Sequence, residues 1–403
     1  MRISTNSMYE TATTQMGSLQ SSIDRTMQQI SSQRRILTPS DDPVASARAL
    51  VVEQAQGMNT QFATNRQNAK SSLSHVDLAL GSATTLIQDV QTLAVAAGNG
   101  SLGNSDRATM ATELEGKLAD LLALANTADG TGGYLFAGFR TGSAPYSQTG
   151  TGATYNGDDG QRQLQVASGR QIDVSVAGRF VFDSGMTGNG SFVTASNTSS
   201  GSSLAISAGS VADASQLTGD SYQIDFTSAT QYNVTRTDSS GAATEIATGR
   251  VYTNGESITV DGMKFEISGT PAADNSLTIE KSEKESIFTT MANLIDVLRT
   301  PADSASAKAA LTAGLATAQN NLRSNYDNVL TARSAAGTSL KEIDYLDSAG
   351  ADLDLQYTST LSDLRDVDYY KAISSLAQQK LTLEAAQKSF TTMSGLSLFN
   401  YIN

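Results

Sequence analysis

Large apolar residues recur at intervals of seven along four stretches of this chain. A seven-residue repeat keeps an apolar stripe on one face of a helix, and that stripe needs a second helix to cover it. The first stretch lies near the N-terminus and contains Tyr9, Met16, Ile23, Ile30 and Leu37. The repeat therefore predicts long helices that pack against one another.

Two of the stretches lie well inside the chain. One alternates steps of four and three residues from Leu73 to Ala97, and the other keeps the seven-residue step from Leu315 to Leu364 with a gap at Gly350. A glycine inside a helix costs roughly 1 kcal/mol relative to alanine, so Gly350 marks the weakest point of the longer helix. We expect both stripes to form the core of a helical bundle within one chain.

The fourth stretch lies close to the C-terminus and contains Tyr369, Leu376, Leu383 and Phe390. It is out of phase with the third stretch, which predicts a helix boundary near residues 365–368. Two prolines in "TPSDDPVASA", directly after Leu37, predict a matching boundary near the N-terminus. The two ends of the chain are thus expected to be separate helical arms, at residues 1–38 and 366–403.

The middle of the chain has a different periodicity. In "SYQIDF", "ESITVDGMKFEIS" and "SLTIEK" apolar and polar residues alternate, and Asp261-Gly262 has the composition of a tight hairpin turn. The Gly/Ser/Thr-rich segment Thr194–Ser210 reads as a flexible connector that would divide the insertion into two small β units. The prediction is a multidomain α+β protein with a β-rich insertion at residues 139–281, flanked by bundle segments at 43–138 and 282–364.

The last nine residues, "GLSLFNYIN", place Leu398 and Phe399 at a chain end, where residues usually fray into water. One apolar seam per arm buries too little surface to offset the backbone entropy of ordering the arm. We therefore expect the arms to be labile in the monomer and to order when identical subunits pack side by side. The predicted subunit interface consists of Tyr9, Met16, Ile23, Ile30, Leu37, Tyr369, Leu376, Leu383, Phe390, Leu398 and Phe399.

The amino-acid composition argues against an enzyme and against a nucleic-acid-binding protein. The chain has no Cys, no Trp and one His, and its formal net charge of −13 disfavours nucleic-acid binding. The lone histidine, His75, reads as a surface residue, and "YNGDDG" (residues 155–160) lacks the further ligands of a calcium loop. No apolar run is long enough to span a membrane. The composition thus argues against an enzyme, and we expect no catalytic residues, metal site or cofactor.

Several segments carry a family resemblance: "MRISTN", "SSQRRILTPSDDPVASARAL", "TGGYLFAGFRT" and "DVDYYKAISSLAQQKLTLEAAQKSF". They resemble the flagellin superfamily of the bacterial flagellum, and within it the branch that forms the junction between hook and filament. "GMKFEISGTPAADNSLTIEK" looks like the small β modules of hook-associated proteins. The resemblance implies a fold in which the terminal arms form an inner coiled-coil core and the β insertion faces solvent.

The resemblance also implies partners and a location. Identical subunits would form a thin extracellular layer on the flagellum after export, unfolded, through the flagellar type III system. A cytoplasmic chaperone would guide export, a hook-associated protein would lie on the hook side, and flagellin or a second junction protein would lie on the filament side. No nucleic acid or membrane insertion is implied.

Two alternatives remain open. Filament flagellin shares the same plan, but flagellins usually have an Ala-Ala-Gly pattern where this chain has Pro43-Val44-Ala45, and their C-termini usually differ from "LSLFNYIN". The second alternative is a secreted glycan-binding adhesin on a helical stalk. In that case Tyr222, Tyr232 and Tyr252 of the insertion would stack on sugars.

Overall fold

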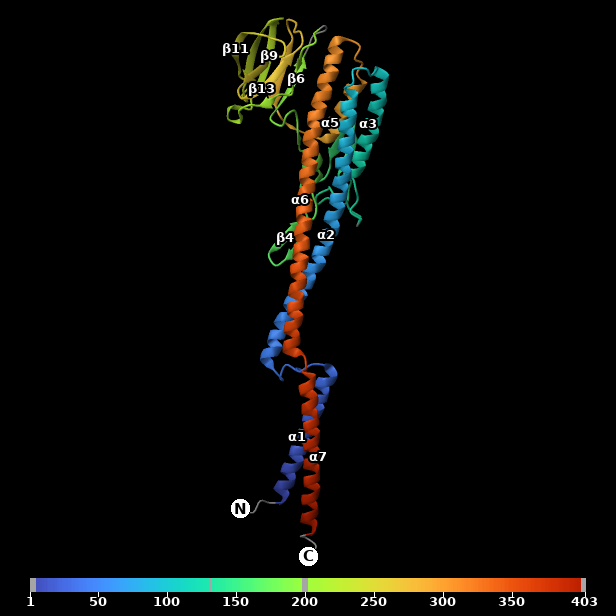
Figure 1. Cartoon of the computed structure of the whole chain (residues 1–403), viewed down its shortest axis with the longest axis vertical. Helices are drawn as coiled ribbons and strands as arrows, with labels where there is room; N and C mark the ends of the chain where they lie inside the picture. The colour runs from blue at the N-terminus through green and yellow to red at the C-terminus, as the bar shows by residue number, and fades with distance from the viewer. Residues whose placement is uncertain (1–4, 131, 198–201, 400–403) are drawn as a thin grey trace. The chain divides into compact units, whose positions relative to one another are not determined.

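A computed structural model describes residues 5–130, 132–197 and 202–399, with the side chains of 5, 6 and 395–399 outside that description. The helices are α1 (Thr5–Ser32), α2 (Pro43–Ala97), α3 (Asn104–Ala125), α4 (Gly178–Phe182), α5 (Ile287–Arg299), α6 (Ala305–Arg365) and α7 (Tyr369–Phe399) (Figure 1). The chain forms two compact units, a terminal unit (Met1–Thr64 and Tyr345–Asn403) and a central unit (Asn65–Asp344). α2 and α6 contribute residues to both units.

The strands fall between α3 and α5. They are β1 (Tyr146–Thr149), β2 (Gly152–Tyr155), β3 (Gln163–Ala167), β4 (Arg170–Asp173), β5 (Gly185–Met186), β6 (Phe192–Asn197), β7 (Ala205–Ile206), β8 (Ser210–Val211), β9 (Ser221–Ser228), β10 (Gln231–Thr237), β11 (Ala243–Val251), β12 (Ser257–Val260), β13 (Met263–Ser268), β14 (Ser276–Lys281) and β15 (Lys284–Glu285). The predicted fold class, helices from both chain ends with a β-rich insertion, is confirmed.

In the central unit, the two inner apolar stripes form the bundle core that the sequence predicts. Every ladder position from Leu73 to Ala97 on α2 is buried, as are the positions of α6 from Leu315 to Ile343. α3 packs against α5, and Lys117 of α3 forms an ion pair with Asp89 of α2 at 2.7 Å. The seven-residue repeat thus correctly identified the core of this bundle.

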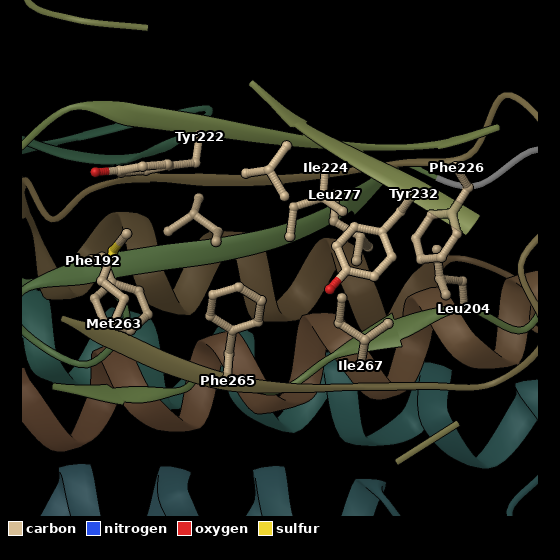
Figure 2. Close-up of a cluster of buried hydrophobic side chains, with 12 residues drawn as sticks. Phe192, Leu204, Tyr222, Ile224, Phe226, Tyr232, Met263, Phe265, Ile267 and Leu277 are labelled. Atoms are coloured by element: carbon tan, nitrogen blue, oxygen red, sulfur yellow. The ribbon is translucent and has the colours of Figure 1, made fainter. Parts of the chain in front are cut away.

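A β-sandwich forms the outer part of the insertion. One sheet has the strand order β11-β10-β9-β14-β6, and the other has the order β12-β13-β7 with β8 also pairing with β13. Side chains from the two sheets point toward one another, among them Ile224 and Phe226 from one sheet and Phe265 and Ile267 from the other (Figure 2). The alternation of apolar and polar residues predicted these strands, because every second side chain faces the core.

Turn chemistry in the sandwich agrees with the prediction at Asp261-Gly262. Both residues have positive φ, 42° and 79°, and Val260 pairs directly with Met263 across the turn.

The prediction of a flexible connector over Thr194–Ser210 was wrong for its described part. Residues 194–197 belong to β6 and pair with β14, while Ala205 and Ile206 form β7. Residues 198–201 lie outside the described residues.

Two short hairpins, one pair of strands that are distant in sequence, and α4 lie between the sandwich and the helices. β1 pairs with β2, β3 with β4, and β5 with β15. Tyr146, Phe182 and Phe288 form a buried aromatic cluster here, with ring centroids 4.9 to 5.9 Å apart. The hydroxyl of Tyr146 donates to Oδ2 of Asp183 at 3.0 Å. Burial is the main reason why the pKa of Asp183 lies above its ordinary value.

In the terminal unit, α6 is continuous through Gly350. The side-chain amide of Asn59 on α2 donates to the carbonyl oxygen of Gly350 at 2.8 Å. Gln56 donates to Asp354 at 3.1 Å, and Arg365 forms an ion pair with Glu53. These polar contacts hold α2 and α6 together where their apolar ladders become sparse.

The helix boundaries near both ends are close to those predicted. α6 ends at Arg365 and α7 begins at Tyr369. α1, however, ends at Ser32, so the prediction that Leu37 lies on the first helix was wrong. Gln33 has a φ of 60°, which ends the helix. The backbone N–H of Arg35 donates to the carbonyl oxygen of Arg365, and that of Val367 donates to the carbonyl oxygen of Gln33. These bonds pair the α1–α2 connection with the α6–α7 connection. Pairing between the two connections replaces the last predicted turn of the helix.

Candidate assembly interface

The residues predicted to form a subunit interface lie mainly along the contact between α1 and α7, which are antiparallel (Figure 1). The rings of Tyr9 and Phe390 meet edge to face with centroids 5.4 Å apart. The hydroxyl of Thr26 donates to the side-chain oxygen of Gln379 at 3.1 Å. The structure thus brings the first and fourth ladders together inside one chain, along a contact that we call the α1–α7 seam.

The α1–α7 seam buries little. Among the side chains described in α1 and α7, only Ile23, Thr26 and Ala372 are buried. Six of the predicted interface residues are half-buried: Tyr9, Met16, Ile30, Leu376, Leu383 and Phe390. Tyr369 is exposed, and Leu37 is half-buried in the connection between α1 and α2. The side chains of Leu398 and Phe399 lie outside the described residues. An intermolecular role for these positions stays a prediction.

The connection between α1 and α2 is shaped by two aspartates. Oδ2 of Asp41 accepts hydrogen bonds from the backbone N–H groups of Leu37 and Thr38, at 2.9 and 3.0 Å. Asp42 caps α2 by accepting from the backbone N–H of Ala45 at 3.0 Å. These backbone donors stabilise the charged carboxylates and hold the pKa of both groups below its ordinary value. The segment "TPSDDPVASA" is therefore a turn held by these hydrogen bonds, followed by the start of α2.

Sequence reasoning missed a set of exposed apolar residues in the terminal unit. On α7 these are Tyr370, Ile373 and Leu381, and on α2 they are Val44, Val51 and Met58. They lie on different helix faces from the residues that hold α1 to α7 and α2 to α6. A signal was present, since Val44, Val51 and Met58 are spaced by seven. Such faces can bind other helices through hydrophobic contact.

His75 and the segment "YNGDDG" have structural explanations. His75 is exposed on α2. Asp158 of "YNGDDG" accepts hydrogen bonds from the backbone N–H groups of Phe139 and Gly160, which lower its pKa. Within the described residues, no group of three or more His, Cys, Asp or Glu side chains could hold a metal ion. The helices of the described residues include none long and apolar enough to cross a bilayer.

The tyrosines that an adhesin would need are not available for stacking on sugars. Tyr222 and Tyr232 are buried in the sandwich core. Tyr252 packs edge to face on Phe226 and donates its hydroxyl to the carbonyl oxygen of Gly269 at 2.7 Å. The adhesin alternative is therefore not supported, because Tyr222 and Tyr232 point into the sandwich core and Tyr252 is held by contacts within the domain.

Comparison with known sequence families gives two matches. Residues 3–141 match the bacterial flagellin N-terminal helical region. Residues 193–281, the sandwich, match the D2-like domain of flagellar hook-associated protein 1. The fold and these matches define a flagellin-type component of the bacterial flagellum.

Relatives that match the whole length of the chain identify its family more closely. Flagellar hook-associated protein 3 of Escherichia coli is 32% identical over 400 residues, which are 99% of each chain. A crystal structure of Xanthomonas campestris FlgL is 31% identical, covers 77% of this chain and 99% of its own, and has a TM-score of 0.71. The flagellar junction protein FlgL of Legionella pneumophila is 28% identical, covers 79% of this chain and 100% of its own, and has the same TM-score. The chain belongs to the flagellar hook-associated protein 3 family.

Proposed function

We propose that this protein is the structural adaptor between the flagellar hook and the filament, and that it assembles through its terminal unit without any catalytic role. The observation that carries the proposal is full-length similarity to flagellar hook-associated protein 3, at both chain ends as well as in the middle. Filament flagellin, the alternative from the same superfamily, is not favoured by these relatives.

The thin α1–α7 seam supports assembly through the chain ends. Only three described side chains of the two helices are buried, so the pair lacks a core that would make it stable alone. Neighbouring subunits would supply the missing cover, and the half-buried ladder residues at the seam would then become fully buried. In this proposal the arms at residues 1–38 and 366–403 form the inner part of the assembly.

The proposal also covers how the chain leaves the cell and which proteins it contacts in the flagellum. The chain would leave the cell through the flagellar type III system with the help of a cytoplasmic chaperone. A hook-associated protein would contact one face of its layer, and flagellin or a second junction protein would contact the other. The bundle segments 43–138 and 282–364 would surround the arms, and the insertion at 139–281 would face solvent. The absence of cysteine fits such a route, because no disulfide can form before transit.

Electron microscopy of a deletion strain tests the adaptor function. We expect intact hooks without filaments and free flagellin in the medium, with filaments restored by the wild-type gene. Filaments of normal length on the deletion strain would contradict the proposal, and so would loss of the filament protein itself.

A substitution tests the role of the ladder. Leu383→Asp places a charge on the half-buried α7 ladder, and we expect it to prevent docking on hooks while leaving the melting of the central unit unchanged. Lys380→Asp, at an exposed position of the same helix, is the matched control and should still form filaments. Normal filaments in the Leu383 variant would count against assembly through the ladder.

A further inference from the structure

Two exposed apolar stripes in the terminal unit have the spacing of coiled-coil seams. The α2 stripe consists of Val44, Val51, Ala55, Met58 and Phe62, separated by steps of seven, four, three and four residues. Three of its large members are strongly exposed, with Val44 at 64%, Val51 at 67% and Met58 at 51%, and Phe62 is half-buried. Steps of three and four place these side chains in one row along the helix. Such a row inserts between the side chains of a facing helix, so the expected partner is a helix.

The α7 stripe consists of Tyr370, Ile373, Ala377 and Leu381. Tyr370 is 92% exposed, Ile373 is 55% exposed and Leu381 is 68% exposed. At 100° per residue the centre of this stripe lies about 125° around α7 from the row of Leu376, Leu383 and Phe390 in the α1–α7 seam. α7 therefore has two apolar faces, and α1 covers only one of them. A helix that is apolar on two faces is normally buried on both.

Both rows carry exposed charges, which are Arg48 on α2 and, on α7, Glu384 followed four residues later by Lys388. Arg48 lies between Val44 and Val51 in the row on α2, and Glu384 continues the row on α7 one turn beyond Leu381. The described part of the chain contains no ion-pair partner for either side chain. A single charge within an apolar seam weakens the seam but fixes its register, provided that the opposing seam carries the opposite charge at the matching height.

The stripes match in one antiparallel register. With Leu381 opposite Val51, the residue opposite Ala55 is Ala377, the residue opposite Phe62 is Tyr370, and the residue opposite Arg48 is Glu384. At these four positions an apolar residue faces an apolar one, small faces small, aromatic faces aromatic and opposite charges pair, while Met58 faces Ser374 and Val44 faces Lys388.

We propose that the α7 stripe of one copy of this chain docks on the α2 stripe of the next copy, antiparallel and in this register. Because the two stripes are different surfaces of the same chain, the contact is head to tail and repeats from copy to copy, as a closed layer or helical array requires. The inference rests on the proposed function for its setting, but it concerns a separate set of residues from the ladder. The ladder holds α1 to α7 within one copy and is completed by neighbouring copies, whereas the stripes are a second, separate surface through which copies meet.

Charge reversal in the full-length chain tests the register. Arg48→Glu and Glu384→Arg each place like charges opposite one another, and we expect each to reduce the number of filaments per cell about tenfold. The combined variant restores the opposite pair and should return filaments close to the wild-type number. A combined variant no better than the single variants would overturn the proposal. Arg323→Glu, a charge reversal on α6 outside both stripes, is the control.

Cross-linking tests which copies are joined. The chain has no native cysteine, so Val51→Cys and Leu381→Cys combined in one chain are specific probes. Flagella from cells making this variant, after mild oxidation, should give a ladder of dimers and higher multimers on a non-reducing gel. Gly57→Cys combined with Gln378→Cys, on the same helices but off the stripes, should give monomer.

The outcomes separate this inference from the adaptor function. If wild-type protein restores filaments to the deletion strain but the Val51/Leu381 variant gives only monomer, the stripe contact is wrong and the adaptor function stands. A dimer that forms equally with Leu381→Cys alone would also overturn the contact, because it would mean that α7 meets α7. If the deletion strain has normal filaments, the adaptor function fails independently of any cross-link.

Discussion

At the scale of single residues, two glycines differ in whether the surrounding atoms leave room for a Cβ atom. Gly138 has a φ of 73°, and a Cβ atom there would lie 2.3 Å from the carbonyl oxygen of Asp158. Gly190 has a φ of 88° but no atom within 4 Å of such a Cβ. Gly138→Ala should destabilise the central unit by about 3 kcal/mol, near the upper end of the usual range for one substitution. Gly190→Ala should cost only about 1 kcal/mol of backbone strain. Denaturant titration of both variants checks this, and equal losses would contradict it.

The buried carboxyl group of Asp183 leads to a prediction about pH. Burial raises its pKa in the folded state, so the folded state binds a proton more readily than the unfolded state does. The charged form therefore destabilises the fold at neutral pH, and this cost disappears as the pH falls through the folded-state pKa. Asp183→Asn should raise the midpoint of thermal unfolding at pH 7, with a gain that shrinks toward pH 4. Asp159→Asn, an exposed neighbour that also contacts Arg179, should show no such pattern. A gain that grows with acidification would refute this explanation.

At the scale of elements, α1 and α7 should lose structure together. Ile23 is one of the three described buried side chains at their seam, and truncating it removes a large share of what the seam buries. Ile23→Ala should cost about 2 kcal/mol, the low end for such a change, because the site is thinly packed. Hydrogen exchange should become faster in both helices and stay unchanged in α3 and α5. Met27→Ala, exposed on the same helix, should have little effect. Faster exchange confined to α1 would mean that α7 is held by other contacts.

Several elements could be predicted from the sequence, and others could not. The inner ladders correctly identified the bundle core, because a repeat of seven leaves one stripe that only another helix can cover. The end of α1 was misplaced, because Leu37 continues the repeat while backbone pairing between two connections, distant in sequence, ends the helix at Ser32. Composition also misassigned Thr194–Asn197, where pairing with β14 outweighs a local Ser/Thr-rich preference.

At the scale of the whole molecule, the terminal unit and the central unit should differ in stability. The central unit contains the buried bundle and the sandwich core. Deletion of residues 381–403 should therefore leave the sandwich and bundle folded, with an unchanged main unfolding transition, while filaments and motility are lost. Circular dichroism melting of the deleted chain beside the full chain checks the first part, and microscopy checks the second. Collapse of the whole helical signal in the deleted chain would show that the ends support the bundle.

The sequence by itself determined the long helices and the β insertion, because periodicity is a local property of the chain, and its matching segments identified the family. Only the tertiary structure decided which apolar faces are already covered. It paired the first ladder with the fourth inside one chain and left the faces around Val51 and Leu381 in water. The physical reason is that a repeat shows a helix face to be apolar, whereas the partner that buries it depends on how distant segments meet in space.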